Sequence, residues 1–418
     1  MAKRPAKNIT SLPNQTMVPT ATVLGRLTVD AEKSEVKVTL LTPLLCLMEP
    51  WSFPPRHAVN LPSIMACMPS DFFWPSVLTH LLEGKDLSLE QAREAMAAVM
   101  AGAATDSQLA AFLMALRAKP ESVEEIVGFR GAILDNAVPL SIDPMVLDIV
   151  GTGGDPYGAV VNVSSIASIV AAAAGVPVVK HGNRAASSSS GASDVLSQLG
   201  LNLDLEPSEV SRVFHQVGIT FVFAAKFHPG FKHAATARKE IGIPTVFNIL
   251  GPLCNPVSPE ASAVGVSDAS RLHQMAGVFQ TRGATALVYR GEDGIDKLTT
   301  TGNSKVLEVS RGHLVEYTIN SGELGLAKAA PEDILGEGPE HNAGLARKVL
   351  AGEPGPVRDI VVLNAAAGLV SFALAEDPAQ QERSLFERLQ EKITVASATL
   401  DSGAAQRKLA EWVEATHC

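Results

Sequence analysis

The feature that most constrains the fold is a change of hydrophobic period near residue 145. From about residue 74 to this point apolar residues recur every three to four positions, whereas after it short apolar runs alternate with helical segments. Residues 145–150 (MVLDIV) predict a strand, residues 164–175 (SSIASIVAAAAG) a helix and residues 176–180 (VPVVK) a second strand. This alternation is typical of an α/β domain with a largely parallel central sheet, in which ligands bind at the carboxyl ends of strands.

The rest of the chain divides around this pattern. Strand and helix signals continue at residues 193–200, 220–225, 270–291 and 304–319. The last third is helical, at residues 341–352, 357–374 and 384–415, and its Ala-rich faces predict close packing against the sheet. We therefore predict a large α/β domain over residues 143–418, with a helical C-terminal part.

A small all-helical domain is predicted ahead of it, over residues 68–142. Residues 77–102, 105–119 and 122–137 have the helical period. Ser88 and Thr105 stand where N-terminal caps belong, each followed by acidic or amide residues in the first turn. With no strand between the helices, packing or dimerisation without chemistry is the simplest interpretation.

Residues 1–67 differ from both domains, because they are punctuated by Pro and lack a persistent period. The apolar stretch at 38–48 is interrupted by Pro43 and is shorter than the about 20 residues of a membrane helix. A targeting peptide's order of charged, apolar and cleavage regions is also missing. We expect a poorly ordered extension, or sequence upstream of a start near Met65 or Met68.

Net charge and cysteine spacing limit the kinds of partner and cellular compartment that suit this chain. The chain has 418 residues and a formal net charge of -10, which disfavours nucleic acid and anionic membranes as partners. Its 4 cysteines lack metal-type spacing, which is typical of reduced thiols in a cytoplasmic protein; they are Cys46, Cys67, Cys254 and Cys418.

A glycine-rich turn follows the first strand of the α/β domain. Glycines let backbone N–H groups converge on an anion, and the N-terminus of the next helix adds partial positive charge. The turn is not a dinucleotide fingerprint, since Pro156 replaces the third glycine, nor a Walker loop. We predict a phosphate or diphosphate site, with a simple strand-to-helix turn as the alternative. The residues are Gly151, Gly153, Gly154, Asn162, Ser164 and Ser165.

A second polar loop follows the next strand and should reach the same edge of the sheet. Lys180 offers a cation, Asn183 a donor and an acceptor, and Ser187 to Ser190 small hydroxyls. Two anion-binding loops at one edge indicate a ligand with two phosphate groups, whereas a solvated surface lysine is the alternative for Lys180 alone.

These motifs resemble those of the anthranilate phosphoribosyltransferase family. GTGGD (151–155), NVSS (162–165), KHGNRAASSSSG (180–191), the block 228–256 containing NILGPL, and GEDGID (291–296) occur in the family's order and spacing. The resemblance covers about residues 70–418. It implies a small helical domain, completed by helices within about 229–256, a large α/β domain, and a homodimer formed through the helical domain.

The resemblance also implies a reaction and its residues. The family transfers phosphoribose from phosphoribosyl diphosphate to the amine of anthranilate in tryptophan biosynthesis, with two Mg2+ per subunit. The phosphoribosyl diphosphate site would comprise Gly151, Thr152, Gly153, Gly154, Asp155, Asn162, Ser164, Ser165, Lys180 and Ser188. The anthranilate site would comprise Gly151, Asn183, His228, Arg238 and Gly251, with Arg238 pairing the carboxylate. The metal ligands would be Ser164 and Asp296.

The chain departs from the family at the metal site. The family has Asp-Glu where this sequence has Asp296 and Lys297, so a second acidic ligand is replaced by a cation. Three interpretations follow: Lys297 partly replaces one metal on the diphosphate, Glu292 or Asp293 supplies the ligand, or catalysis is impaired. We favour a surviving but altered metal site.

A second departure lies in the glycine turn, where Val160 stands at the family's Thr position and one extra residue follows Asp155. Two other functions are kept as alternatives. One is an inactive or repurposed relative that binds another partner; the other is a pyrimidine nucleoside phosphorylase, which should lack the HGNRAASS and NILGPL blocks present here.

Overall fold

The computed structural model describes residues 27–30, 35–38, 73–158, 160–184 and 190–418. Residues 1–61 and 62–418 form separate units, and each is considered by itself. In the first, β1 (Leu27–Asp30) pairs with β2 (Glu35–Val38) as an antiparallel hairpin, which the sequence analysis does not predict. Our expectation for residues 1–67 otherwise falls outside the described residues.

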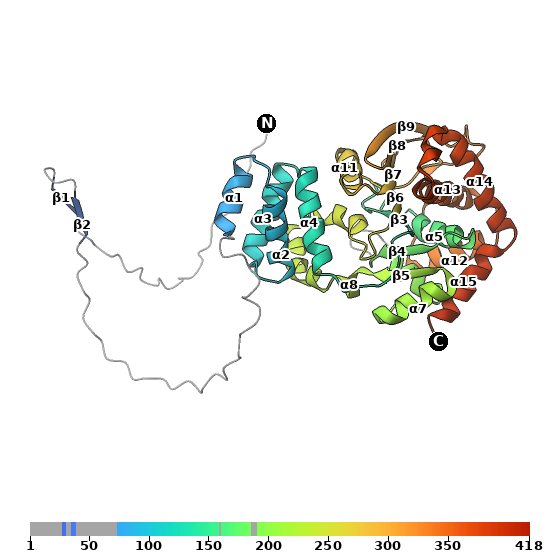
Figure 1. The fold of residues 1–418 in the computed structure, drawn as a ribbon, viewed down its shortest axis with the longest axis horizontal. Coiled ribbons are helices and arrows are strands. Elements are labelled where there is room, and N and C mark those ends of the chain that lie inside the picture. Colours follow the sequence, from blue (N-terminus) through green and yellow to red (C-terminus); the bar gives the residue numbers. More distant parts are fainter. Residues whose placement is uncertain (1–26, 31–34, 39–72, 159, 185–189) are drawn as a thin grey trace, which may run out of the picture. The chain divides into compact units, whose positions relative to one another are not determined.

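The second unit begins with four helices (Figure 1), which are α1 (Trp74–Leu82), α2 (Leu89–Met100), α3 (Asp106–Ala118) and α4 (Val123–Asp135). Ser88 and Thr105 close capping boxes with Gln91 and Gln108, so the predicted caps are confirmed. Ser122 caps α4 in the same way. Helices α2, α3 and α4 therefore begin where local side-chain hydrogen bonds cap them.

A seven-stranded sheet, counted over the described residues, follows in the order β5-β4-β3-β6-β7-β8-β9. The strands from β5 to β7 are parallel, whereas β8 and β9 join antiparallel at one edge. Their bounds are β3 (Leu147–Gly151), β4 (Val178–Gly182), β5 (Ile219–Phe223), β6 (Ala261–Gly265), β7 (Thr285–Gly291), β8 (Asn303–Ser310) and β9 (His313–Asn320). The predicted fold class is confirmed.

Further helices alternate with the strands and follow them in the chain. They are α5 (Val163–Ala173), α6 (Ala192–Gln198), α7 (Pro207–Val217), α8 (Ala224–Phe227), α9 (Ala235–Ile241), α10 (Phe247–Leu250), α11 (Leu272–Arg282), α12 (Pro339–Leu350), α13 (Pro356–Glu376), α14 (Leu385–Asp401) and α15 (Ala404–Ala415). Short 3-10 turns lie at Pro229–Ala234, Gly251–Leu253, Ala269–Arg271, Pro331–Ile334 and Pro378–Glu382.

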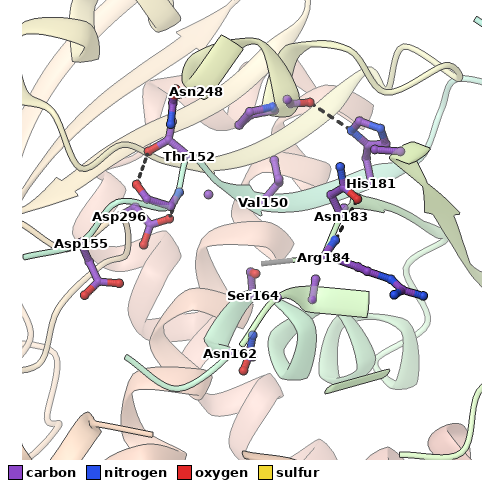
Figure 2. Close-up of a pocket in the computed structure, with 18 of the residues that line it drawn as sticks. Val150, Thr152, Asp155, Asn162, Ser164, His181, Asn183, Arg184, Asn248 and Asp296 are labelled. Carbon is purple, nitrogen blue, oxygen red and sulfur yellow. Dashed lines mark hydrogen bonds between the residues drawn. The ribbon is translucent and has the colours of Figure 1, made fainter. Parts of the chain in front are cut away.

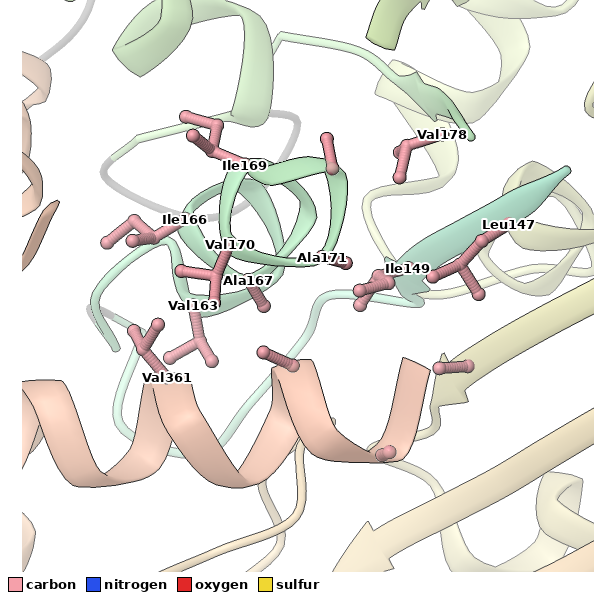
Figure 3. Packing of buried hydrophobic residues seen from close by; sticks show 14 of the residues in the cluster. Leu147, Ile149, Val163, Ile166, Ala167, Ile169, Val170, Ala171, Val178 and Val361 are labelled. Carbon is pink, nitrogen blue, oxygen red and sulfur yellow. The ribbon is translucent and has the colours of Figure 1, made fainter. Parts of the chain in front are cut away.

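One large core packs α5 and α13 against the strands (Figure 3). Gly368 of α13 faces β3 so closely that a Cβ there would lie 2.6 Å from Cδ1 of Ile149. Small residues on α13 thus let the helix approach the sheet, as the Ala-rich pattern predicts. This contact fixes β3, and with it the glycine turn that follows β3.

A second core joins the helical bundle to the sheet. It combines Phe112 and Phe129 with Val264 and Val288 of β6 and β7, and it includes Phe247 from the segment 229–256. In the same segment, α9 packs on α3 and the 3-10 turn Pro229–Ala234 packs on α2. The bundle is thereby held close to the carboxyl ends of the strands.

Helix α13 is long and apolar enough to cross a membrane by composition, but 78% of its most apolar window is buried inside the domain. A buried core helix passes the same test, so the composition of α13 is explained by its packing. Cys254 is buried and Cys418 exposed, and both are free thiols.

Candidate active site at the carboxyl edge of the sheet

A cavity of about 290 Å³ opens where β3, β4, β5 and β7 end (Figure 2). Its wall includes the turn after β3, the N-terminus of α5, the loop after β4 and the segment after β7. The helices near residues 231–252 close the opposite side. The cavity therefore lies at the sheet edge that the sequence pattern predicts for a ligand.

The glycine turn brings backbone close to Asp296. Gly151 and Gly265 are partners on β3 and β6. A Cβ on Gly265 would lie 1.6 Å from the carbonyl oxygen of Asp296, and one on Gly151 would lie 2.1 Å from its Oδ2. Gly153 and Gly154 have φ of 71° and 76°, which non-glycine residues rarely adopt. Only a glycine-rich turn can pack this tightly around the carboxylate.

Two groups hold the carboxylate of Asp296, the backbone of Gly153 and the side chain of Lys297. Its Oδ2 accepts a hydrogen bond of 2.8 Å from the backbone N–H of Gly153. Its Oδ1 accepts a hydrogen bond from the ammonium of Lys297. The side chains of Asp296 and Lys297 are only 7% and 11% exposed. The acid expected to bind metal is thus already paired with the adjacent cation.

Lys180 lies deeper, under the same edge. Its Nζ donates a hydrogen bond of 2.7 Å to the carbonyl oxygen of Ile149, and the side chain is 1% exposed. Burial lowers the pKa of Lys180 to about 8, although Asp148 and Asp296 oppose the shift. Burial also raises the pKa of Asp148 to about 6, against the effects of Lys180 and Asn255. Near neutral pH this places a buried cation at the cavity wall.

The N-terminus of α5 faces the cavity beside this cation. Asn162 is the N-cap, yet its side chain caps no amide of the first turn. Instead its Nδ2 donates a hydrogen bond of 3.1 Å to the carbonyl oxygen of Ser190, and its Oδ1 accepts one of 2.9 Å from Nδ2 of Asn342. Asn162 therefore ties the loop after β4 and helix α12 to α5, and leaves the helix terminus available for an anion.

The opposite side of the cavity carries a cation on an aromatic surface. The guanidinium of Arg238 lies 5.0 Å from the ring centroid of Phe247, and Phe247 meets Phe231 edge to face at 5.8 Å. Burial lowers the pKa of Arg238, and no ion pair to Arg238 is found among the described residues. A planar ligand bearing a carboxylate matches this combination.

His181 lines the cavity and has a buried imidazole ring. Its Nδ1 lies 3.0 Å from the carbonyl oxygen of Gly251, which can only accept a hydrogen bond. Burial, followed by the nearby His228, lowers the pKa of His181 to about 3, so the ring is neutral. Nδ1 therefore carries the hydrogen. Nε2 keeps a lone pair and has no hydrogen-bond partner among the described residues.

Most of the expected site residues line the cavity. They are Gly151, Thr152, Gly153, Asp155, Asn162, Ser164, Lys180, Asn183, Arg238, Gly251 and Asp296, together with Lys297. Gly154, Ser165 and His228 are not among its lining residues. The ring of His228 packs against His181 and Phe231 at 5.2 and 5.1 Å. Ser188 lies outside the described residues.

Other lining residues were not assigned a role from the sequence. His181, Arg184, Phe231, Phe247 and Asn248 all line the cavity. The position of His181 directly after Lys180, at the end of a predicted strand, was the available signal. Phe231, Phe247 and Asn248 could be associated with the site only through the family block at 228–256.

The alternative acidic ligands, Glu292 and Asp293, lie outside the lining of the cavity. Asp293 Oδ2 accepts from the hydroxyls of Thr299 and Thr301 at 2.7 and 2.5 Å, and Oδ1 accepts from the N–H of Ile295 at 3.3 Å. Neither Asp293 nor the exposed Glu292 lines the cavity. In the described part of the chain, no cluster of three or more His, Cys, Asp or Glu residues is arranged to hold a metal.

Comparison with known proteins places this architecture in a family. Residues 143–406 match the model "Glycosyl transferase family, a/b domain", and residues 75–137 match "Glycosyl transferase family, helical bundle domain". Anthranilate phosphoribosyltransferase of Clavibacter michiganensis subsp. michiganensis is 60% identical over 349 residues, covering 84% of this chain and 99% of the relative. The enzyme of Thermobifida fusca is 49% identical over 347 residues, covering 83% and 98%.

Solved structures agree with the sequence relatives. Anthranilate phosphoribosyltransferase from Thermus thermophilus superposes with a TM-score of 0.74 at 39% identity, covering 82% of this chain and 99% of that chain. The Saccharomyces cerevisiae enzyme in complex with PRPP and Mg has a TM-score of 0.73 at 28% identity, covering 82% and 98%. With sequence and fold in agreement, this chain belongs to the anthranilate phosphoribosyltransferases of the glycosyl transferase family.

Proposed function

We propose that the protein catalyses, in this cavity, transfer of the phosphoribosyl group of phosphoribosyl diphosphate to the amine of anthranilate, with release of diphosphate. The observation that carries the proposal is the pairing of two unlike ends in one cavity. The glycine turn, the N-terminus of α5 and Lys180 form an anion-binding end, and Arg238 on Phe247 forms an end suited to an aromatic carboxylate. A donor and an acceptor substrate each have a matching surface.

At the anion-binding end, we place the phosphates on backbone and helix-terminus groups. Gly151, Gly153 and Thr152 supply the turn after β3, and Ser164 supplies a hydroxyl in the first turn of α5. Lys180 adds a fixed positive charge beneath them. Helix N-termini and converging N–H groups bind phosphates without a dedicated side-chain cage.

At the acceptor end, Arg238 is proposed to pair the anthranilate carboxylate while the ring contacts Phe247 and Phe231. Asn183 and Gly251 line the path between the ends. Nε2 of His181 is buried in the ligand-free structure, and a shift of the ring would let its lone pair accept a hydrogen bond from the aromatic amine. This hydrogen bond would orient the amine nitrogen toward the donor sugar. It would also stabilise the positive charge that develops on the amine as the new bond forms.

The chemistry requires little proton transfer. The C1–O bond to diphosphate breaks as the amine nitrogen bonds to C1, so negative charge develops on the leaving oxygens and positive charge on the sugar. The nitrogen then loses one proton, which the released diphosphate or water accepts. The chain's contribution is to orient the amine and to neutralise the leaving group in a cavity partly screened from water. The buried side chains around the cavity suit this electrostatic and positional role.

Magnesium is proposed to accompany the diphosphate, and the residues present suit one ion. Mg2+ is commonly held by one or two carboxylates together with substrate phosphates and water. Asp296 and the hydroxyl of Ser164 line the anion-binding end and would hold it. When bound, the ion supplies positive charge to the leaving group. A homodimer through the helical domain and a cytoplasmic location remain predictions from the family resemblance.

The test is loss of anthranilate fluorescence on mixing the purified chain with phosphoribosyl diphosphate and Mg2+. Loss that depends on all three components, with release of diphosphate, supports the proposal. A folded chain that stays silent at every Mg2+ concentration points to the inactive or repurposed relative. Phosphorolysis of thymidine or uridine would instead indicate a nucleoside phosphorylase.

A further inference from the structure

Lys297 adds a cation to the lining of the anion-binding end. Its ammonium contacts Oδ1 of Asp296, and both side chains are largely buried and line the cavity. A lysine at the surface would keep its charge in water, where an ion pair with a phosphate contributes little binding free energy. The position of Lys297 inside the cavity gives its charge a functional consequence.

Asp296 cannot easily move away from this contact. Its backbone carbonyl packs on Gly265 and its Oδ2 on Gly151, where even one added carbon would clash. The N–H of Gly153 fixes Oδ2 at 2.8 Å. Oδ1 is therefore the oxygen whose partner can change, and a metal ion and the Lys297 ammonium would compete for it.

The carboxylates of the cavity are too few for two ions. Among the described lining residues these are Asp155 and Asp296. Asp155 Oδ1 accepts from the N–H groups of Tyr157 and Gly158 at 3.1 and 2.8 Å, and so stabilises its own turn. Asp293 is satisfied by Thr299 and Thr301 outside the cavity. A second divalent ion would thus face an ammonium and lack a carboxylate of its own.

Charge balance gives the lysine a role. One carboxylate, one ammonium and one divalent ion present a net formal charge of about +2 to the diphosphate. Two carboxylates with two divalent ions, as in a Lys297→Glu variant, present the same about +2. The ammonium can therefore deliver the charge that a second ion would otherwise bring.

We propose that Lys297 is a diphosphate-binding residue that replaces a second divalent ion, so that one ion per subunit completes the site. This inference rests on the proposed function for the identity of the diphosphate ligand. In the ligand-free chain Lys297 occupies Oδ1 of Asp296. With diphosphate present its ammonium contacts a phosphate oxygen and leaves Oδ1 to the ion.

The test counts ions and measures diphosphate binding, independently of turnover. Mn2+ bound per subunit is measured by electron paramagnetic resonance with and without inorganic diphosphate, and diphosphate affinity by calorimetry at fixed Mn2+. The wild type is compared with Lys297→Met, which removes the charge, and Lys297→Glu, which reverses it. Lys348→Glu makes the same charge change on exposed α12 and is the matched control.

For the wild type we expect one Mn2+ per subunit with diphosphate and weak binding without it. Lys297→Met should still bind one ion, with diphosphate affinity about tenfold weaker, as expected for losing a charged hydrogen bond. Lys297→Glu should bind two ions with diphosphate and retain more Mn2+ in its absence. Lys348→Glu should match the wild type. Thermal unfolding of each variant confirms that it is folded.

Two ions in the wild type, or unchanged diphosphate affinity in Lys297→Met, would overturn the inference. Failure of the proposed function has a different signature. A wild type that binds one Mn2+ with diphosphate but consumes no anthranilate would leave the role of Lys297 standing and reject the transferase reaction. Consumption of anthranilate with two bound ions would do the reverse.

Discussion

The imidazole of His181 is oriented by a carbonyl far along the chain, with Nδ1 3.0 Å from the oxygen of Gly251, 70 residues away. The ring is neutral, and its Nε2 is a buried hydrogen-bond acceptor that has no partner among the described residues. His181→Ala should therefore raise KM for anthranilate about two- to tenfold, as expected for one lost neutral hydrogen bond. KM for phosphoribosyl diphosphate should change less. Equal effects on both KM values would contradict this role.

Arg238 is predicted to matter more, because it would pair a full negative charge. Arg238→Ala should raise KM for anthranilate by about ten- to a hundredfold, the range for losing a charged hydrogen bond. Lys239→Ala, an exposed neighbour on α9, serves as the control and should leave KM unchanged. Steady-state kinetics with anthranilate and with aniline separates the effects. If Arg238 pairs the carboxylate, the variant should discriminate less between the two amines.

Lys180 predicts a pH dependence. Its pKa of about 8 means that the ammonium is charged below that pH and loses its proton as the pH rises through it. Affinity for phosphoribosyl diphosphate should therefore fall above about pH 8. Lys180→Arg, if folded, should keep its charge and lose this step, since guanidinium does not deprotonate in this range. A wild-type KM for the donor that stays flat to pH 9.5 would show that Lys180 does not act on the phosphates.

The glycine turn predicts a steric effect. Gly151→Ala should displace the carboxylate of Asp296, since the new Cβ would lie 2.1 Å from Oδ2. We expect a stability loss of about 1–3 kcal/mol, typical of overpacking, and weaker Mn2+ binding with diphosphate. Gly344→Ala is the control, because Gly344 lies within α12 with no atom within 4 Å of the added carbon. Urea unfolding and Mn2+ binding of both variants test the claim, and a fully stable Gly151→Ala would contradict it.

Local patterns predict the fold well in this chain because they agree with its tertiary packing. The caps at Ser88 and Thr105 and the period change near Met145 are properties of neighbouring residues, so they can be inferred from sequence. The hairpin Leu27–Asp30 with Glu35–Val38 was missed, since its flanks carry no turn signal that outweighs the surrounding irregularity.

The site is only partly predictable for a physical reason. The glycine turn and Lys180 follow strand ends, and parallel strands bring such positions together. What each side chain does there depends on distant partners. The side chain of Asn162 is hydrogen-bonded to Ser190 and Asn342, and the ring of His181 is oriented by the carbonyl oxygen of Gly251. None of these contacts has a local sequence signal.

The central claim is that this cavity joins phosphoribose to anthranilate with Lys297 in place. The most direct measurement is the rate of anthranilate fluorescence loss with phosphoribosyl diphosphate, across a Mg2+ titration, for wild type and Lys297→Glu. We predict turnover by the wild type that saturates with Mg2+, and a shifted Mg2+ dependence in the variant. A silent wild type beside an active Lys297→Glu variant would contradict the account, because Lys297 would then disable the reaction.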